Sequence, residues 1–107
     1  MRMWRWEITE DAANDLEDIW GYVYSYSGDE EHADVLLDNL EVLFDAICRN
    51  PYAHAIYQFP EGYRPAHEYR SANHGRYKVF YRTDEKRKAV LIYRVRHMAS
   101  DFTRVSL

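Results

Sequence analysis

Residues 76–97 read RYKVFYRTDEKRKAVLIYRVRH, and this stretch decides the fold class. Residues 76–82 alternate in side-chain character, which is the period-two pattern of a strand. On one side lie Tyr77, Val79 and Tyr81, and on the other lie Arg76, Lys78, Phe80 and Arg82. Residues 89–96 form the most apolar run and are predicted to be a central strand, and the polar segment 84–88 is typical of a turn.

Two amphipathic helices are predicted upstream of these strands. Apolar residues at helical spacing indicate a helix over residues 10–26, with Thr9 as its N-cap and an end at the following glycine. Residues 27–30 match a capping box for a second helix, with Asp29 as the rival cap. The second helix should end near Asn50, because the next residue is a proline. The short link between them implies an antiparallel helical hairpin.

The remaining segments complete the predicted order of elements. Residues 4–8 alternate and are predicted to be a short strand, whereas residues 51–65 contain the three prolines and are predicted to be a loop. Residues 67–72 are a weaker strand prediction, with a turn at residues 73–75. Residues 99–107 have no clear pattern.

These elements predict a single domain over residues 1–107. The fold class is α+β: an N-terminal strand, then an antiparallel helical hairpin packed on one face of a mainly antiparallel sheet, in the order β-α-α-β-β-β. With both helices on one face, the other face of the sheet is expected to be solvated or to bind a partner.

Composition limits the classes of protein that this chain can belong to. It has 107 residues, 47% of them hydrophobic and 16% aromatic, with one cysteine. A single cysteine excludes an internal disulfide framework and a multi-cysteine zinc site, and it fits a cytoplasmic protein. No apolar run has the length of a signal peptide or a membrane span. The histidines form no metal-binding pattern and there is no glycine-rich phosphate loop, so neither a metal nor a cofactor is expected.

Charge is divided unequally along the chain. The net charge of −4 argues against a dedicated nucleic-acid binder. Residues 1–50 nevertheless hold three basic and thirteen acidic residues, a net of −10, and residues 51–107 hold eleven basic and five acidic residues, a net of +6. Such asymmetry indicates either a charged partner or two solvated faces of opposite sign.

The predicted strands concentrate basic and aromatic side chains that could bind a partner. Guanidinium groups bind phosphate and carboxylate, and aromatic rings can stack on bases. The alternative is that these side chains only keep a half-buried sheet soluble. Candidate partner-binding residues are Arg70, Arg76, Lys78, Arg82, Arg94 and Arg96 on the sheet, with Trp20 and Tyr24 along the helical hairpin.

Several strings, in their order and spacing, resemble the RelE/ParE superfamily of toxins from bacterial type II toxin–antitoxin pairs, with the ParE-like branch closest. The resemblance spans nearly the whole chain. It is carried by WEITEDA at residues 6–12, DLEDIW at 15–20, ICRNP at 47–51, GRYKVFYR at 75–82 and VLIYRVRH at 90–97.

The resemblance implies different activities in its two branches. RelE-like members cut messenger RNA on the ribosome, and ParE-like members are described as inhibitors of DNA gyrase. By position, Lys78 matches the basic residue of the third-strand motif, and His97 matches the last-strand histidine of some RNA-cutting members. At the next position, where those members can carry a catalytic tyrosine, this chain has Met98, which cannot transfer a proton. If the chain were a nuclease, the catalytic candidates would be Lys78, Arg76, Arg82, Arg96 and His97.

The resemblance therefore predicts a ParE-like toxin that inhibits gyrase and is neutralised by a cognate antitoxin in a hetero-oligomeric complex. One alternative is a ribosome-dependent ribonuclease acting on mRNA, and another is an inactive relic that only binds an antitoxin. No membrane partner is expected. Residues 100–107 are a candidate gyrase contact, because family toxins often depend on their C-terminus.

Overall fold

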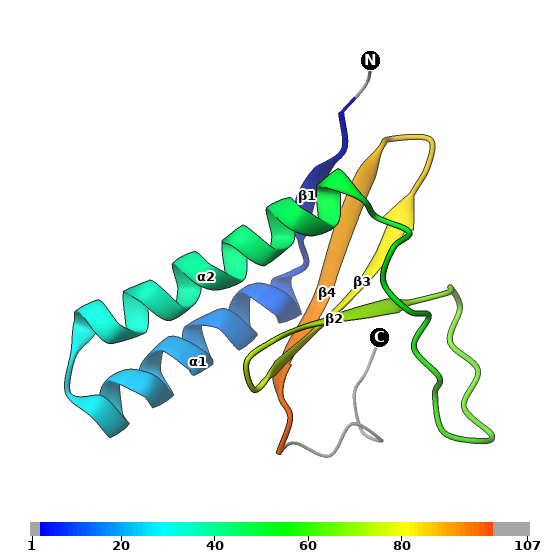
Figure 1. Ribbon diagram of the computed structural model, residues 1–107. Coiled ribbons are helices and arrows are strands. Elements are labelled where there is room, and N and C mark those ends of the chain that lie inside the picture. The colour runs from blue at the N-terminus through cyan, green and yellow to red at the C-terminus, as the bar shows by residue number, and fades with distance from the viewer. Residues whose placement is uncertain (1–2, 100–107) are drawn as a thin grey trace.

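The computed structural model describes residues 3–99 as a two-layer α+β domain (Figure 1). A helical hairpin packs on one face of a four-stranded sheet, as the sequence predicts. The elements in chain order are β1 (Arg5–Ile8), α1 (Glu10–Ser27), α2 (Glu30–Arg49), β2 (Arg70–His74), β3 (Tyr77–Asp84) and β4 (Ala89–His97).

The sheet has the strand order β1-β4-β3-β2. Strand β3 pairs antiparallel with both β2 and β4, whereas β1 lies parallel to β4 at one edge of the sheet. The sheet is therefore mixed. The apolar strand β4 is central, as predicted. A β-bulge between Phe80 and Tyr81 shifts the register of β3 against β4.

Both helices begin at side-chain caps. The Thr9 hydroxyl accepts the Ala12 N–H at 3.1 Å, and α1 ends at Gly28 in the left-handed conformation, which glycine adopts without strain. Asp29 caps α2 by accepting the N–H groups of Glu31 and His32. Of the two predicted caps for α2, Asp29 is therefore the observed one. Ser27 belongs to the last turn of α1, where its hydroxyl donates to the Val23 carbonyl.

The core lies between the helices and the face of the sheet that they cover; we call the opposite face the far face. Its fully buried members include Leu40 and Phe44 of α2 and Ile92 of β4. Val79 and Tyr81 of β3 also point into it, as the alternation predicts. The buried Tyr81 hydroxyl donates to the Pro51 carbonyl, and burial raises the pKa of this phenol to about 12.

Strand β2 lies later in the chain than predicted. It covers Arg70–His74 rather than residues 67–72, because Asn73 and His74 continue the ladder opposite Lys78 and Tyr77. The reversal is therefore tighter than the predicted turn at residues 73–75. It is centred on Gly75, whose φ of 56° favours glycine.

The far face of the sheet is partly covered, which corrects the expectation of an open face. The segment of residues 51–69 pairs with the start of β2 through an isolated bridge between Ile56 and Arg70. Its Tyr57 ring packs edge-on against Phe80, with ring centroids 4.9 Å apart, and Phe80 is fully buried. The aromatic side chains of this segment exclude water from a face that strand alternation assigns to solvent.

Candidate interaction groove

Asp15 of α1 hydrogen-bonds to the edge of β4 beyond Ile92, where the pairing with β1 ends. Its carboxylate accepts two hydrogen bonds from Arg94, at 2.7 and 2.9 Å, and a third from the Val95 N–H at 2.9 Å. Asp15 is buried, and its hydrogen bonds raise the pKa of Arg94. This ion pair fixes α1 against β4 and so sets the width of the space between them.

Two adjoining hollows form a groove between α1 and the ends of β3 and β4. One, of about 370 Å³, lies between α1 and β4, and the other, of about 570 Å³, extends to the start of α2 and the turn between β2 and β3. They share Tyr22, Tyr77 and His97. We call this continuous space the α1 groove.

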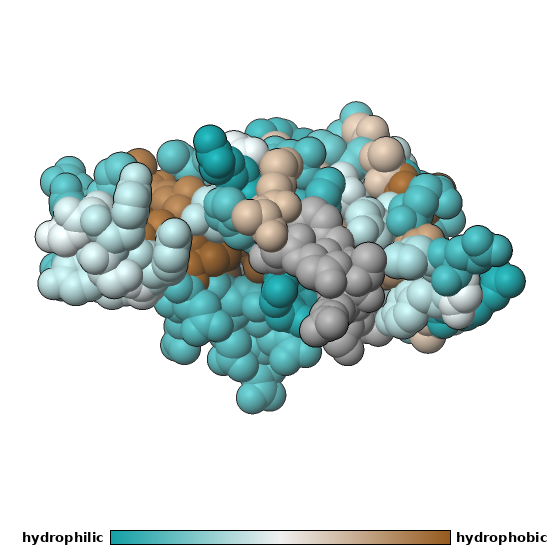
Figure 2. Space-filling model, turned by 90° about the horizontal axis from the view of Figure 1, so that it is seen from below, coloured by the Kyte–Doolittle hydropathy of each residue, from teal (hydrophilic) through white to brown (hydrophobic). Residues whose placement is uncertain are grey.

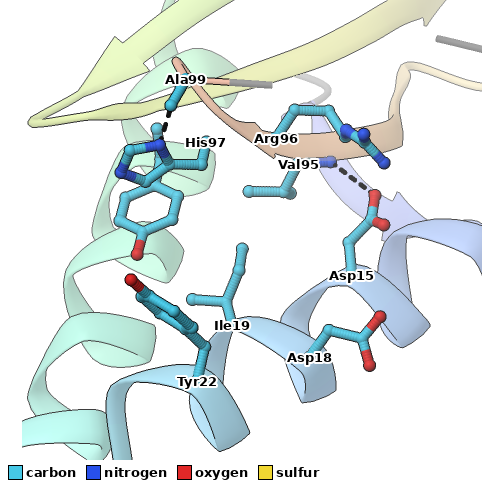
Figure 3. A pocket seen from close by; sticks show the side chains of 9 residues that line it. Asp15, Asp18, Ile19, Tyr22, Val95, Arg96, His97 and Ala99 are labelled. Carbon is cyan, nitrogen blue, oxygen red and sulfur yellow. Dashed lines mark hydrogen bonds between the residues drawn. The ribbon is translucent and has the colours of Figure 1, made fainter. Parts of the chain in front are cut away.

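The α1 groove has an apolar floor and a polar rim. Ile19 and Val95 face each other across the first hollow, with Tyr22 and His97 on one side and Asp15, Asp18 and Arg96 on the other (Figure 3). Figure 2 shows a brown apolar surface beside the pale tip of the helical hairpin. Such a floor with a charged rim suits an amphipathic protein segment.

Arg96 carries an unsatisfied hydrogen-bond donor at this groove. Its Nε atom is buried and has no hydrogen-bond partner within the part of the chain that the structure describes. A buried N–H without a partner costs free energy. Arg76, exposed on the turn between β2 and β3, adds a second cation to the same groove.

His97 is held in a fixed orientation at the end of β4. Its Nδ1 accepts the Ala99 N–H at 3.0 Å, which assigns the proton of the neutral ring to Nε2 (Figure 3). The ring packs edge-on against Tyr77, with centroids 5.2 Å apart. Burial raises the pKa of the Tyr77 phenol, so this hydroxyl stays protonated at neutral pH.

Two of the predicted partner-binding arginines are engaged within the protein. Arg94 forms the ion pair with Asp15 described above. The Arg70 guanidinium donates to the carbonyls of His54 and Tyr52 and lies over the Tyr52 ring, so it holds the 51–69 segment in place. Both side chains contribute to the fold.

The other predicted basic residues fall into two groups, one at the α1 groove and one outside it. Arg76, Arg96 and His97 lie at the α1 groove. Lys78 donates to Asn73 at 3.0 Å, and Arg82 donates to the Tyr93 hydroxyl at 3.2 Å while lying over that ring. The five nuclease candidates therefore do not all face one hollow.

Trp20 and Tyr24 lie on the other side of α1 from the groove. Trp20 donates to Asp34 of α2 at 2.8 Å and stacks on Tyr24, with ring centroids 5.3 Å apart. They line the outer seam of the helical hairpin. The partner-binding role predicted for them stays a prediction.

Sequence reasoning missed the groove-facing aromatic residues of α1. Tyr22 and Tyr26 stack on one another, with ring centroids 6.3 Å apart, and both are largely exposed. Their i, i+4 spacing, off the apolar stripe, was a signal that the sequence offered. Residues 100–107, the predicted gyrase contact, lie outside the described residues.

Other chemistry within residues 3–99 is sparse. Burial raises the pKa of the Cys48 thiol to about 11, so this cysteine is a poor nucleophile. No group of three or more histidine, cysteine or acidic residues in this range could hold a metal ion. Neither of the described helices is both long and apolar enough to cross a bilayer.

The fold is shared with chains of two solved complexes. The chain is similar to a chain of the RelBE2 toxin–antitoxin complex of Mycobacterium tuberculosis, with 23% identity and a TM-score of 0.62, over 90% of this chain and 99% of that one. It is also similar to a chain of the archaeal RelE–RelB complex of Pyrococcus horikoshii, with 15% identity and a TM-score of 0.52, over 94% and 100% of the two chains. At these identities the likeness establishes the fold alone, a two-layer α+β domain.

The family follows from the sequence. The family described as ParE toxin of type II toxin–antitoxin system, parDE, matches residues 6–102. The chain therefore belongs to the ParE toxin family, within the RelE/ParE superfamily that its motifs resemble. No curated protein sequence matches it.

Proposed function

We propose that this protein is a cytoplasmic toxin that stops bacterial growth by binding DNA gyrase, and that a cognate antitoxin neutralises it by occupying the α1 groove. The observation that carries the proposal is the family match over residues 6–102. A target-binding mode of action is further supported by the site, because Met98 stands where a proton-transferring tyrosine would be needed.

The contacts of the basic side chains also favour binding over cleavage. A ribonuclease needs cationic and proton-transfer groups gathered around one phosphate. Here Lys78 and Arg82 are hydrogen-bonded to side chains outside the α1 groove, and Nδ1 of His97 accepts a backbone N–H. In this arrangement Lys78, Arg82 and His97 are not gathered around one position that a scissile phosphate could occupy.

The antitoxin partner is supported by the two solved relatives, which are toxin–antitoxin complexes. The α1 groove suits a segment with apolar side chains and a carboxylate. The apolar groups would cover Ile19 and Val95, and the carboxylate would accept from Arg96. Such pairing with the guanidinium group is charge-assisted.

Substitutions in the α1 groove should weaken antitoxin binding without unfolding the protein. We expect Tyr22→Ala and Arg96→Ala each to raise the dissociation constant at least about tenfold, since tyrosine and arginine side chains carry much of the binding free energy at protein interfaces. Calorimetric titration of purified toxin with antitoxin measures this. Tyr24→Ala, on the other side of α1, is the matched control. A larger loss from Tyr24→Ala would place the antitoxin on the outer seam instead.

Ribosome-dependent mRNA cleavage is the second candidate function, because both solved relatives are RelE-type complexes. Inducing the chain alone in a bacterium separates the possibilities. We expect growth arrest, and the same arrest with Lys78→Ala plus His97→Ala, since neither side chain has a catalytic role in a gyrase-binding toxin. Loss of arrest in the double variant, with codon-positioned mRNA cuts by the unaltered chain, would support the nuclease. Normal growth with the unaltered chain would indicate an inactive relic.

A further inference from the structure

The outer edge of β1 is an unpaired strand edge on the opposite side of the sheet from β2. β1 is the terminal strand of the order β1-β4-β3-β2, so only one of its edges is hydrogen-bonded within the described chain. The Arg5 N–H donates to Lys88 and the Thr9 N–H to Ile92, both toward β4. Because backbone groups alternate in direction along a strand, those of Trp6 and Ile8 point outward. Among residues 3–99 no other strand pairs with these groups, so they can pair with a strand of another molecule.

The side chains along this edge are self-complementary under one register. In an antiparallel pairing of two copies of β1 centred on Trp6, Arg5 of each copy lies opposite Glu7 of the other. The outward backbone groups of Trp6 then meet those of the second Trp6, so the centre is a hydrogen-bonded pair. The flanking Arg5–Glu7 pairs are non-hydrogen-bonded pairs, where opposite side chains come closest.

The same register also matches apolar groups on the helix-facing side of the sheet. Trp4 of one copy lies opposite Ile8 of the other, and Ile8 is exposed in the single chain. Beside Trp4 lies an open hollow of about 750 Å³ between β1 and the end of α2. Asp45 and Arg49 line this hollow and carry opposite charges. The hollows of two copies can therefore approach without repulsion between like net charges.

The charged side of the edge is already ordered. Glu7 accepts from Arg5 at 2.9 Å and from Arg87 at 2.6 Å, so its carboxylate is fixed beside the edge. Charges on an edge strand commonly prevent pairing. Here two opposite charges stand two residues apart, and antiparallel self-pairing turns them into attractive pairs.

From these observations we propose that two copies of this protein associate through antiparallel pairing of their β1 edges, centred on Trp6, to form one continuous eight-stranded sheet. The partner is a second copy of this chain. The α1 groove extends toward the turn between β2 and β3, away from the outer edge of β1. Pairing of the β1 edges therefore leaves the groove of each copy accessible.

Charge reversal at the two edge residues tests the proposal and its register. The purified full chain should sediment as a monomer–dimer equilibrium over a wide concentration series. Arg5→Glu and Glu7→Arg should each raise the dimer dissociation constant at least about tenfold, because both cross-strand pairs become repulsive. An equimolar mixture of the two variants should form a heterodimer, since each glutamate then faces an arginine. Arg64→Glu, an exposed charge reversal in the 51–69 segment, is the matched control and should leave the equilibrium unchanged.

Circular dichroism of each variant separates misfolding from lost association, and the mixture keeps the test decisive even if one variant is less stable. Three results would overturn the proposal. They are a monomeric unaltered chain at all concentrations, a dimer that neither reversal weakens, and a mixture that remains monomeric. A monomeric chain whose antitoxin binding is weakened by Arg5→Glu would assign the edge to the antitoxin.

Discussion

Replacing Asp15 with alanine should lower the free energy of unfolding by about 3–5 kcal/mol, the cost of breaking a buried ion pair by removing one partner. The substitution leaves the Arg94 side chain, which is only 15% exposed, without its counter-charge. It also leaves the Val95 N–H without its acceptor. Because small domains are stable by only about 5–15 kcal/mol, this loss is a large fraction of the whole. Urea unfolding followed by circular dichroism measures it.

Asp18→Ala is the matched control for that experiment. Asp18 lies one turn further along α1 and lines the same groove, yet it makes no hydrogen bond or ion pair among the described residues. Its removal should change stability by no more than about 0.5 kcal/mol. In the double variant Asp15→Leu, Arg94→Met, part of the stability should return, since no buried charge is then left unpaired. Equal effects of Asp15→Ala and Asp18→Ala would contradict the assigned role of Asp15.

Phe80→Ala should also destabilise the protein by about 3–5 kcal/mol, because it removes a fully buried ring and leaves a cavity. On an open sheet face the same change would be nearly neutral, so the experiment tests whether the 51–69 segment covers that face. Hydrogen exchange should speed up in this segment, whose Tyr57 rests on the Phe80 ring. Val42→Ala, at an exposed position of α2, is the control. A stability change as small as that of Val42→Ala would mean that the far face is uncovered in solution.

The sequence carried strong information about the elements and weak information about how distant segments meet. The period-two pattern of β3 and the apolar run of β4 predicted both strands, and the helical stripes with their caps predicted the hairpin. Local propensity also left Ser27 and Asp29 as rival caps, and only the geometry of the link selected Asp29.

The interactions that shape the groove could not be predicted. Asp15 and Arg94 are 79 positions apart, and no local pattern distinguishes their pair from the many other charges on the chain. The prolines of the 51–69 segment indicated a loop, whereas burial of its aromatic rings against Phe80 depends on tertiary packing. For the same reason, Trp20 and Tyr24 were favoured over Tyr22 as contact residues, although Tyr22 faces the groove.

A supercoiling assay with purified gyrase tests the central claim most directly. We predict that the purified chain inhibits supercoiling at concentrations comparable to that of the enzyme. Addition of the cognate antitoxin should restore supercoiling, and Lys78→Ala plus His97→Ala should leave inhibition intact. Full supercoiling at a large excess of a chain that still arrests growth would contradict gyrase as its target.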